Sequence, residues 1–179
     1  APLKLKKQDP PMFAKVETEA TVHKFRALVN ASAATPPRVD IGMDDISVIQ
    51  YTGGTTGLSK GAILTHRNLS SNVQQVRSWF TGVAEGEEVL LSVLPFFHIF
   101  GLSVCMAWPM SVGAKIVLQP NPRDIDGMVK NLVKHKVSLF PALPALFNAI
   151  NNYEGIDKVD LSAVKYCFSG SAPLPEDVQ

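Results

Sequence analysis

The sequence predicts an α/β fold in which a mostly parallel sheet carries helices on both faces. From about residue 45 onward, short apolar runs alternate with stretches whose apolar residues repeat at helical spacing. Strands that alternate with helices usually pair in parallel and are covered on both faces. The 179 residues also suffice for one domain with a sizeable buried core.

The composition excludes several classes of function. Charged residues make up 18% of the chain, below the roughly 25% of typical globular domains, and the formal net charge is only +1. This balance argues against a nucleic-acid partner. Cys105 and Cys167 lack CxxC spacing, so the sequence indicates neither a disulfide framework nor a metal site. We expect both thiols to be buried and reduced, as free cysteines usually are.

The chain divides into an irregular connecting segment, residues 1–44, and a partial domain, residues 45–179. Prolines interrupt the first segment, in which only a short helix around residues 21–31 is expected. In the second, the spacing of Leu69, Val73, Val76 and Phe80 predicts a helix over about 66–80. Further helices are predicted over 100–112, around 125–133 and around 143–150, and strands over 46–51, 89–94, 115–118, 137–140 and 165–169.

One uncharged stretch is long enough to suggest a membrane span. Residues 89–114 are 26 residues without Asp, Glu, Lys or Arg, more than the roughly 20 that cross a bilayer. Pro95, Gly101 and Pro109 interrupt the stretch, however, and His98 lies near its middle. A strand, a turn and a buried helix account for it better, so no transmembrane segment is expected.

The carboxyl ends of parallel strands are where such sheets bind ligands. In this chain they direct attention to the segments that follow Tyr51, Leu94 and Phe168.

The first of these segments has the composition of an anion-binding loop. Residues 52–61 contain four glycines and three threonines and include a lysine, Lys60. Glycines allow successive backbone N–H groups to turn toward one point, while hydroxyls and an ammonium group add donors for phosphate oxygens. The loop is not a Walker A motif, because Ser59 precedes the lysine and Gly61 follows it. The alternative is a flexible glycine-rich turn.

The residues from Tyr51 to Gly57, followed by Lys60 and Gly61, resemble the signature of the adenylate-forming (AMP-binding) superfamily. That superfamily includes acyl-CoA synthetases, aryl-CoA ligases, firefly-type luciferases and the adenylation domains of peptide synthetases. Its commonest form has proline where Ser59 stands here. The resemblance implies that the loop closes over the β- and γ-phosphates of ATP. The implied nucleotide-binding residues are Tyr51, Thr52, Gly53, Gly54, Thr55, Thr56, Gly57, Leu58, Ser59, Lys60, Gly61 and Ala62.

The second segment, residues 94–101, resembles the family motif Pro-Phe-x-His-x-Phe-Gly, which lines the acyl-substrate tunnel. Taken alone, a histidine in an aromatic run is more often a core residue. The resemblance instead implies a substrate site formed by Phe97, His98, Phe100, Gly101 and Leu102. It makes Thr56, Lys60 and His98 the candidate catalytic residues. His98 is expected to position the substrate rather than act as a base, because a carboxylic acid with a pKa near 4 is already ionised at pH 7.

The third segment is Ser169–Leu174. Taken alone it reads as an ordinary turn, but it resembles the family segment whose backbone borders the adenine ring. Gly170, Ser171, Ala172 and Pro173 are the implied contacts. Small residues at a strand end allow a flat ring to approach the backbone closely.

Within the superfamily, residues 121–125 and 146–152 resemble bacterial long-chain fatty-acid–CoA ligases. The implied reaction converts a fatty acid and ATP to an acyl-adenylate, which CoA then converts to acyl-CoA. The implied ligands are thus fatty acid, ATP, CoA and Mg²⁺, with the Mg²⁺ ligands largely outside this chain. An aryl-CoA or other acid–CoA ligase, a peptide-synthetase-type adenylation domain and a non-catalytic nucleotide-binding module remain open.

The resemblance covers well under half of a family member, so the chain is expected to be part of the large N-terminal domain. The segments expected after Gln179 hold the glutamate for Mg²⁺, the aspartate for ribose and, in a C-terminal domain, a catalytic lysine. The isolated piece is therefore expected to be inactive. We expect a cytoplasmic location, with peripheral membrane association and oligomerisation left open.

Overall fold

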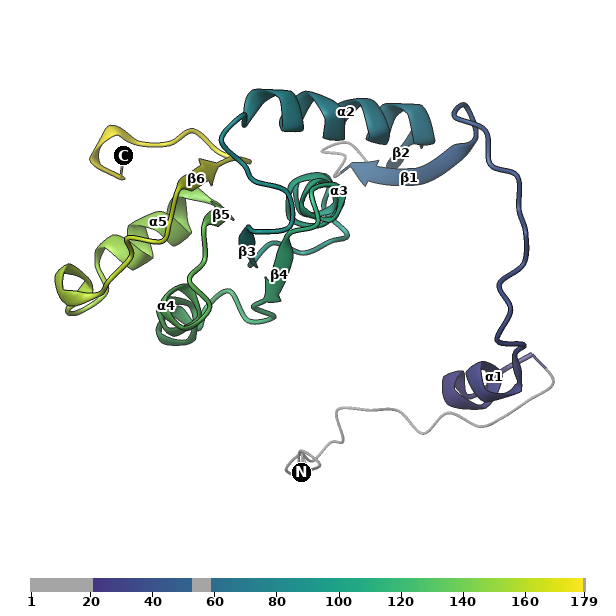
Figure 1. The fold of residues 1–179 in the computed structure, drawn as a ribbon, viewed down its shortest axis with the longest axis horizontal. Helices are drawn as coiled ribbons and strands as arrows, with labels where there is room; N and C mark the ends of the chain where they lie inside the picture. The colour runs from purple at the N-terminus through teal and green to yellow at the C-terminus, as the bar shows by residue number, and fades with distance from the viewer. Residues whose placement is uncertain (1–20, 53–58, 179) are drawn as a thin grey trace. The chain divides into compact units, whose positions relative to one another are not determined.

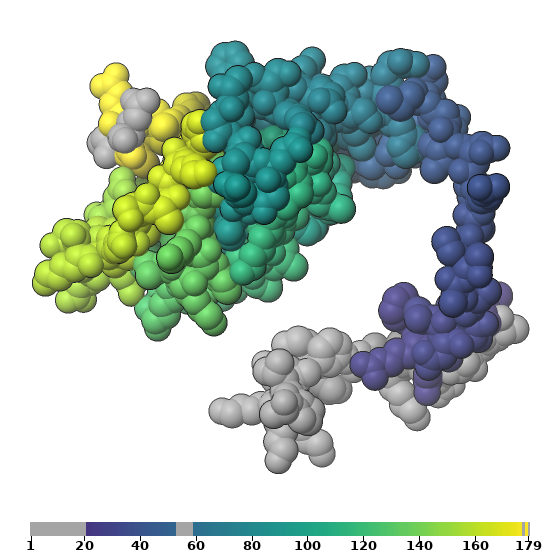
Figure 2. All heavy atoms as spheres, in the orientation of Figure 1, coloured from purple at the N-terminus to yellow at the C-terminus, as the bar shows by residue number. Residues whose placement is uncertain are grey.

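The computed structural model describes residues 21–52 and 59–178 (Figure 1). The chain divides into two compact units, residues 1–40 and 41–179. In the first unit, helix α1 (Phe25–Ala31) buries none of its side chains. It confirms the short helix expected there. In Figure 2 the atoms coloured from teal to yellow, which belong to residues 59–178 of the second unit, form one packed body.

The second unit contains a four-stranded parallel sheet in the order β4-β3-β5-β6. Its strands are β3 (Val89–Ser92), β4 (Lys115–Leu118), β5 (Leu139–Ala142) and β6 (Tyr166–Ser169). The predicted α/β fold with a mostly parallel sheet is thereby confirmed. β5 begins two residues later than predicted, because the N–H of Val137 bonds back to the carbonyl of Leu132 and closes the preceding helix.

Helices lie on both sides of these strands (Figure 1). Helix α2 (His66–Trp79) packs against the π-helix η1 (Gly101–Ala107) and helix α3 (Trp108–Ser111), while α4 (Ile125–Lys134) packs against α5 (Pro144–Asn151). The 3₁₀ turns η2 (Ile156–Lys158) and η3 (Glu176–Val178) complete the described elements. The helix predicted over 100–112 is thus a π-helix followed by one α-helical turn.

Local capping signals position two of the helices. Thr65 and Asn68 form a reciprocal capping box at the start of α2. Asp124 caps α4, its carboxylate accepting the N–H of Gly127 at 2.9 Å. No helix in the described part of the chain is long and apolar enough to cross a membrane.

The core lies on both faces of the parallel sheet. Leu90, Leu91 and Leu139 from the strands, Trp108 from α3 and Met128 from α4 are completely buried. Aromatic rings fix the end of α2 to the sheet: the Phe80 ring lies 4.5 Å from Phe168 and 5.4 Å from Trp108. Edge-to-face contacts of this kind stabilise packing beyond the area that they bury.

The first strand does not belong to this sheet, contrary to the prediction. β1 (Ile46–Thr52) pairs antiparallel with β2 (Lys60–Thr65) in a separate two-stranded sheet. No strand was predicted over β2, because its apolar run is short and begins with lysine and glycine. The prediction for the cysteines was half right. Cys105 is buried in η1, but Cys167 is exposed on β6, the edge strand.

Candidate functional site

The β1–β2 hairpin brings the two ends of the glycine-rich loop together. Thr52 lies opposite Lys60 and Tyr51 opposite Gly61 in the strand register. The Thr52 hydroxyl donates to the Lys60 carbonyl at 3.3 Å and closes the base of the loop. The predicted residues Gly53, Gly54, Thr55, Thr56, Gly57 and Leu58 lie outside the described residues. The residues that flank this loop on its two sides therefore lie next to each other in the hairpin.

Lys60 is at the end of this loop and is exposed to solvent. In residues 21–52 and 59–178, none of the ion pairs involves Lys60. Ser59 and Ala62 beside it are exposed as well. Gly61 has a packing role, because a Cβ on it would lie 2.6 Å from a methyl carbon of Ile49. The hairpin thus presents its lysine to solvent, where an anion could approach.

The segment after β3 contacts this hairpin directly. The side-chain amide of Gln50 in β1 donates to the carbonyl of Phe97 at 3.1 Å, across 47 residues of sequence. Phe97 is 83% exposed, so its ring does not hold the segment in place. The Gln50 hydrogen bond brings the second predicted segment to the base of the first.

His98 is held by its own turn. Its side chain is exposed, which contradicts the alternative of a core histidine. The Phe100 N–H donates to Nδ1 of the ring at 3.2 Å, and the His98 N–H donates to the Pro95 carbonyl at 3.1 Å. When Nδ1 accepts, a neutral ring carries its proton on Nε2. His98 can therefore present an Nε2–H donor to a ligand.

The third segment reaches the second through an aromatic ring. Gly170, directly after β6, hydrogen-bonds the Ala142 carbonyl and lies against Phe100. A Cβ at Gly170 would be 2.8 Å from two carbons of the Phe100 ring, closer than real contacts allow. Ser171 has a φ of +66°, an uncommon conformation for a residue with a side chain. The structure therefore brings together the described parts of all three predicted segments.

Two observations limit the chemistry of this site. The described residues of the three segments include no Asp or Glu, so the residues present do not supply a Mg²⁺ site. Cys105, in η1 behind the His98 turn, is completely buried. Burial raises the pKa of its thiol to about 11, so the thiol stays protonated at neutral pH and does not serve as a nucleophile.

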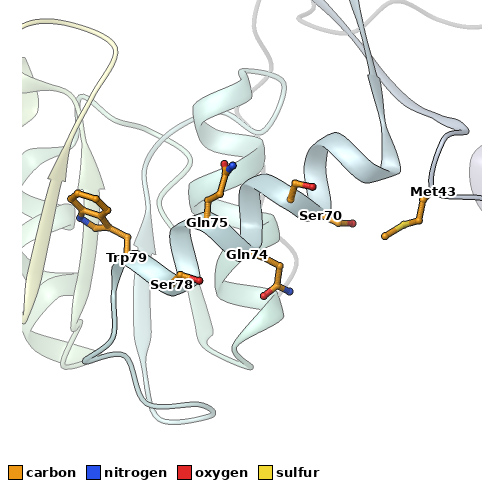
Figure 3. A pocket seen from close by; sticks show the side chains of 7 residues that line it. Met43, Ser70, Gln74, Gln75, Ser78 and Trp79 are labelled. Atoms are coloured by element: carbon orange, nitrogen blue, oxygen red, sulfur yellow. The ribbon is translucent and has the colours of Figure 1, made fainter.

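A hollow of about 310 Å³ lies at the carboxyl ends of β3 and β4. Its walls are largely apolar and include Leu94, Pro95 and Phe96, which lead into the His98 turn, and Leu118 at the end of β4. Ligands of parallel sheets bind at this edge. A larger hollow, of about 750 Å³, lies along α2 (Figure 3), but none of the predicted site residues lines it.

Gln50 is a site residue that sequence reasoning missed. A single glutamine in a strand carries no signal, and its partner, Phe97, becomes a neighbour only in the folded chain.

Comparisons with known proteins identify the family of the chain. Residues 4–179 match the family described as AMP-binding enzyme. The long-chain-fatty-acid–CoA ligase of Bacillus subtilis is 37% identical over 163 residues, covering 89% of this chain and 29% of that ligase. The 4-coumarate–CoA ligase 1 of Solanum tuberosum is 36% identical over 163 residues, covering 90% of this chain and 30% of that ligase. The chain thus spans less than a third of the length of these relatives.

Solved structures give the same result. The inhibitor-bound N-terminal domain of FACL13 from Mycobacterium tuberculosis has a TM-score of 0.76 at 29% identity, covering 86% of this chain and 37% of that one. ATP-bound MatB from Rhodopseudomonas palustris has a TM-score of 0.76 at 27% identity, covering 86% of this chain and 29% of that one. The chain therefore belongs to the AMP-binding enzyme family, and its fold is that of part of the N-terminal domain of adenylate-forming ligases.

Proposed function

We propose that this chain is the phosphate-binding part of a longer ligase that activates a fatty acid with ATP and transfers it to CoA. The convergence of the three segments carries the proposal. The Gln50–Phe97 hydrogen bond and the Phe100–Gly170 contact bring a loop suited to phosphate, a histidine turn and a strand end suited to a flat ring to one place. Residues 45–179 are then part of the AMP-binding domain, and residues 1–44 lead into it.

The proposed reaction needs a site that stabilises a leaving group. A carboxylate oxygen attacks the α-phosphorus of ATP, and the bond from that phosphorus to pyrophosphate breaks. The sulfur of CoA then attacks the acyl carbonyl and gives up its proton, and AMP leaves. Negative charge builds on the departing pyrophosphate, so donors fixed in advance lower the barrier. We assign this role to the loop, with Thr56 and Lys60 as its catalytic members.

The other segments receive the remaining parts of the substrates. His98 would present its Nε2–H to the carboxylate or to an α-phosphate oxygen and position the two. Phe97, Phe100 and Leu102 would form the apolar wall, while Gly170, Ser171, Ala172 and Pro173 would border the adenine. The described residues of the three segments offer Mg²⁺ no carboxylate, so its ligands would come from elsewhere in the ligase.

A fatty acid is favoured as substrate by the relatives named long-chain-fatty-acid–CoA ligase and by the apolar hollow beside the His98 turn. The 4-coumarate ligase at similar identity keeps an aryl acid as the second candidate. Pyrophosphate release by the full-length ligase, measured with palmitate and with 4-coumarate, separates the two. Faster release with 4-coumarate would assign the aryl acid instead. A cytoplasmic location remains a prediction.

The decisive test is Lys60→Ala in the full-length ligase. We expect adenylation to fall by about 10²- to 10³-fold, as when one transition-state donor is lost, while the melting temperature stays unchanged because Lys60 is exposed. Lys134→Ala, at another exposed lysine, should leave the rate unchanged. Parallel losses of rate and stability in Lys60→Ala would contradict the role of Lys60.

A non-catalytic nucleotide-binding module is the alternative from another class. Both proposals predict that the 179-residue chain alone releases no pyrophosphate, but only the ligase proposal predicts release by the full-length protein. Calorimetric titration of the chain with pyrophosphate tests binding separately from turnover.

A further inference from the structure

The hydrogen bond from Gln50 to Phe97 links the β1–β2 hairpin to the turn that carries His98. Gln50 is half-buried in β1 and donates through Nε2 to the Phe97 carbonyl at 3.1 Å and, more weakly, to its neighbour Tyr51 at 3.4 Å. Among the described residues, no other hydrogen bond joins β1 or β2 to residues 94–102. This bond is therefore the direct hydrogen-bonded link between the two segments in the described part of the chain.

The peptide group that Gln50 holds is the one that leads into His98. Because a peptide group is planar, fixing the Phe97 carbonyl also fixes the orientation of the His98 N–H. That N–H donates to the Pro95 carbonyl at 3.1 Å, and the His98 carbonyl accepts the N–H of Leu102 at 2.8 Å. His98 is thus held from both sides of its backbone.

The turn around His98 has no slack to absorb a displacement. A Cβ on Gly101 would lie 2.2 Å from the Pro95 carbonyl oxygen, so the two ends of the turn are in close contact. Packed interiors transmit strain rather than dissipate it. A shift of the Phe97 carbonyl would therefore move the imidazole as well.

We propose that Gln50 is a positioning residue that holds His98 in place relative to the β1–β2 hairpin. It is two residues before Thr52, which closes the base of the loop. The inference rests on the proposed function, since it concerns the alignment of the acid with the nucleotide.

Two substitutions at Gln50 distinguish the effect of its N–H donor from the effect of the size of its side chain. Gln50→Glu keeps the size but places a carboxylate against a carbonyl oxygen, which the two groups cannot share as a hydrogen bond. Gln50→Lys restores an N–H donor at similar reach. Gln75→Glu, on the exposed face of α2, makes the same chemical change away from the site.

The experiment measures pyrophosphate release by the full-length ligase with varied acid and varied ATP. We expect Gln50→Glu to lower kcat/KM for the acid by about 10- to 100-fold, as a displacement of about 1 Å does. The Kd of ATP should change less than about threefold, because Lys60 and the loop are intact. Gln50→Lys should recover most of the activity, and Gln75→Glu should match the wild type.

Amide hydrogen exchange gives a readout that does not depend on turnover. In Gln50→Glu the His98 amide should exchange faster than in the wild type. Normal kinetics and normal exchange in Gln50→Glu would overturn the inference, as would equal losses in Gln50→Glu and Gln50→Lys that follow their melting temperatures. Failure of the wild-type ligase to release pyrophosphate would instead overturn the proposed function.

Discussion

Gly170 is the residue at which the third predicted segment meets the histidine turn. Its missing side chain leaves room for the ring of Phe100, whose carbons would be 2.8 Å from a Cβ. Glycine is required here by close packing rather than by its backbone angles. A sequence shows that glycine is present at a strand end, but not which ring fills the space.

Gly170→Ala should therefore destabilise the chain by about 1–3 kcal/mol, the usual cost of overpacking. In a Phe100→Leu background the same substitution should cost less, because the smaller side chain leaves room for the methyl group. Urea unfolding of both single variants and the double variant measures the difference. Gly42→Ala serves as control, since a Cβ there meets only atoms at 3.5 Å or more. Equal costs of Gly170→Ala in both backgrounds would show that Phe100 is not the obstacle.

At the scale of elements, helix α4 is followed, two residues after its last position, by a lysine in an unfavourable conformation. Lys136 has a φ of +49°, and the N–H groups of Lys136 and Val137 bond back to the carbonyls of Val133 and Leu132. This is the Schellman ending, for which glycine is the usual residue. A lysine at this position has a steric penalty, because a residue with a side chain disfavours the left-handed region.

Lys136→Gly should stabilise the chain by about 1 kcal/mol, because glycine occupies this conformation without a steric penalty. The opposite sign is expected for Lys134→Gly in the last helical position, which should cost up to about 1 kcal/mol. Thermal unfolding of the two variants compares them directly. A loss of stability in Lys136→Gly would mean that the lysine side chain makes a contribution that outweighs the strain.

The elements that the sequence predicted well are those specified locally. Helices α2 and α4 follow the spacing of their own apolar residues, and Asp124 caps the helix immediately after it. The pairing of strands, by contrast, is not specified by nearby residues. β1 could not be assigned to its hairpin, because β2 gave no strand signal and pairing depends on a partner beyond the loop.

At the scale of the whole unit, a buried charge joins three strands at the amino edge of the sheet. The carboxylate of Glu88, before β3, is fully buried and accepts from Lys165 at 2.7 Å, from the Ala84 N–H at 3.0 Å and from the Ser138 hydroxyl. Lys165 precedes β6, and Ser138 precedes β5. The candidate site occupies the opposite, carboxyl edge, so this cluster serves stability.

Because of this cluster, the free energy of unfolding should depend on pH. Burial of Glu88 alone would raise its pKa, but the hydrogen bonds from Lys165, Ser138 and Ala84 together hold the pKa below its ordinary value. A lowered folded-state pKa means that the stabilisation is complete above about pH 4.5 and is lost as the pH falls through the folded value. Unfolding midpoints between pH 7 and pH 3 should show this loss.

Glu88→Gln should destabilise the chain by about 2–4 kcal/mol at pH 7, somewhat less than a fully buried pair because Lys165 is half-exposed. It should also reduce the loss of stability between pH 7 and pH 3. Asp44→Asn, which breaks the exposed pair with Arg67, should have little effect. An unchanged acid profile in Glu88→Gln would assign the acid sensitivity to other groups.

At this scale the sequence predicted the architecture and the three segments of the site, because alternation and motifs are visible in order along the chain. It did not predict the Glu88 cluster, in which Ser138 and Lys165 are 50 and 77 residues from Glu88. Nor did it predict the contacts between the segments, which depend on the order of the strands.

The separate β1–β2 sheet has a mechanical consequence. In residues 21–52 and 59–178 no ladder hydrogen bond ties it to the parallel sheet, so a shift of the hairpin that carries Lys60 would not require a core strand to lose its pairing. The Gln50 amide would limit such a shift, because it bonds the hairpin to the Phe97 carbonyl at 3.1 Å.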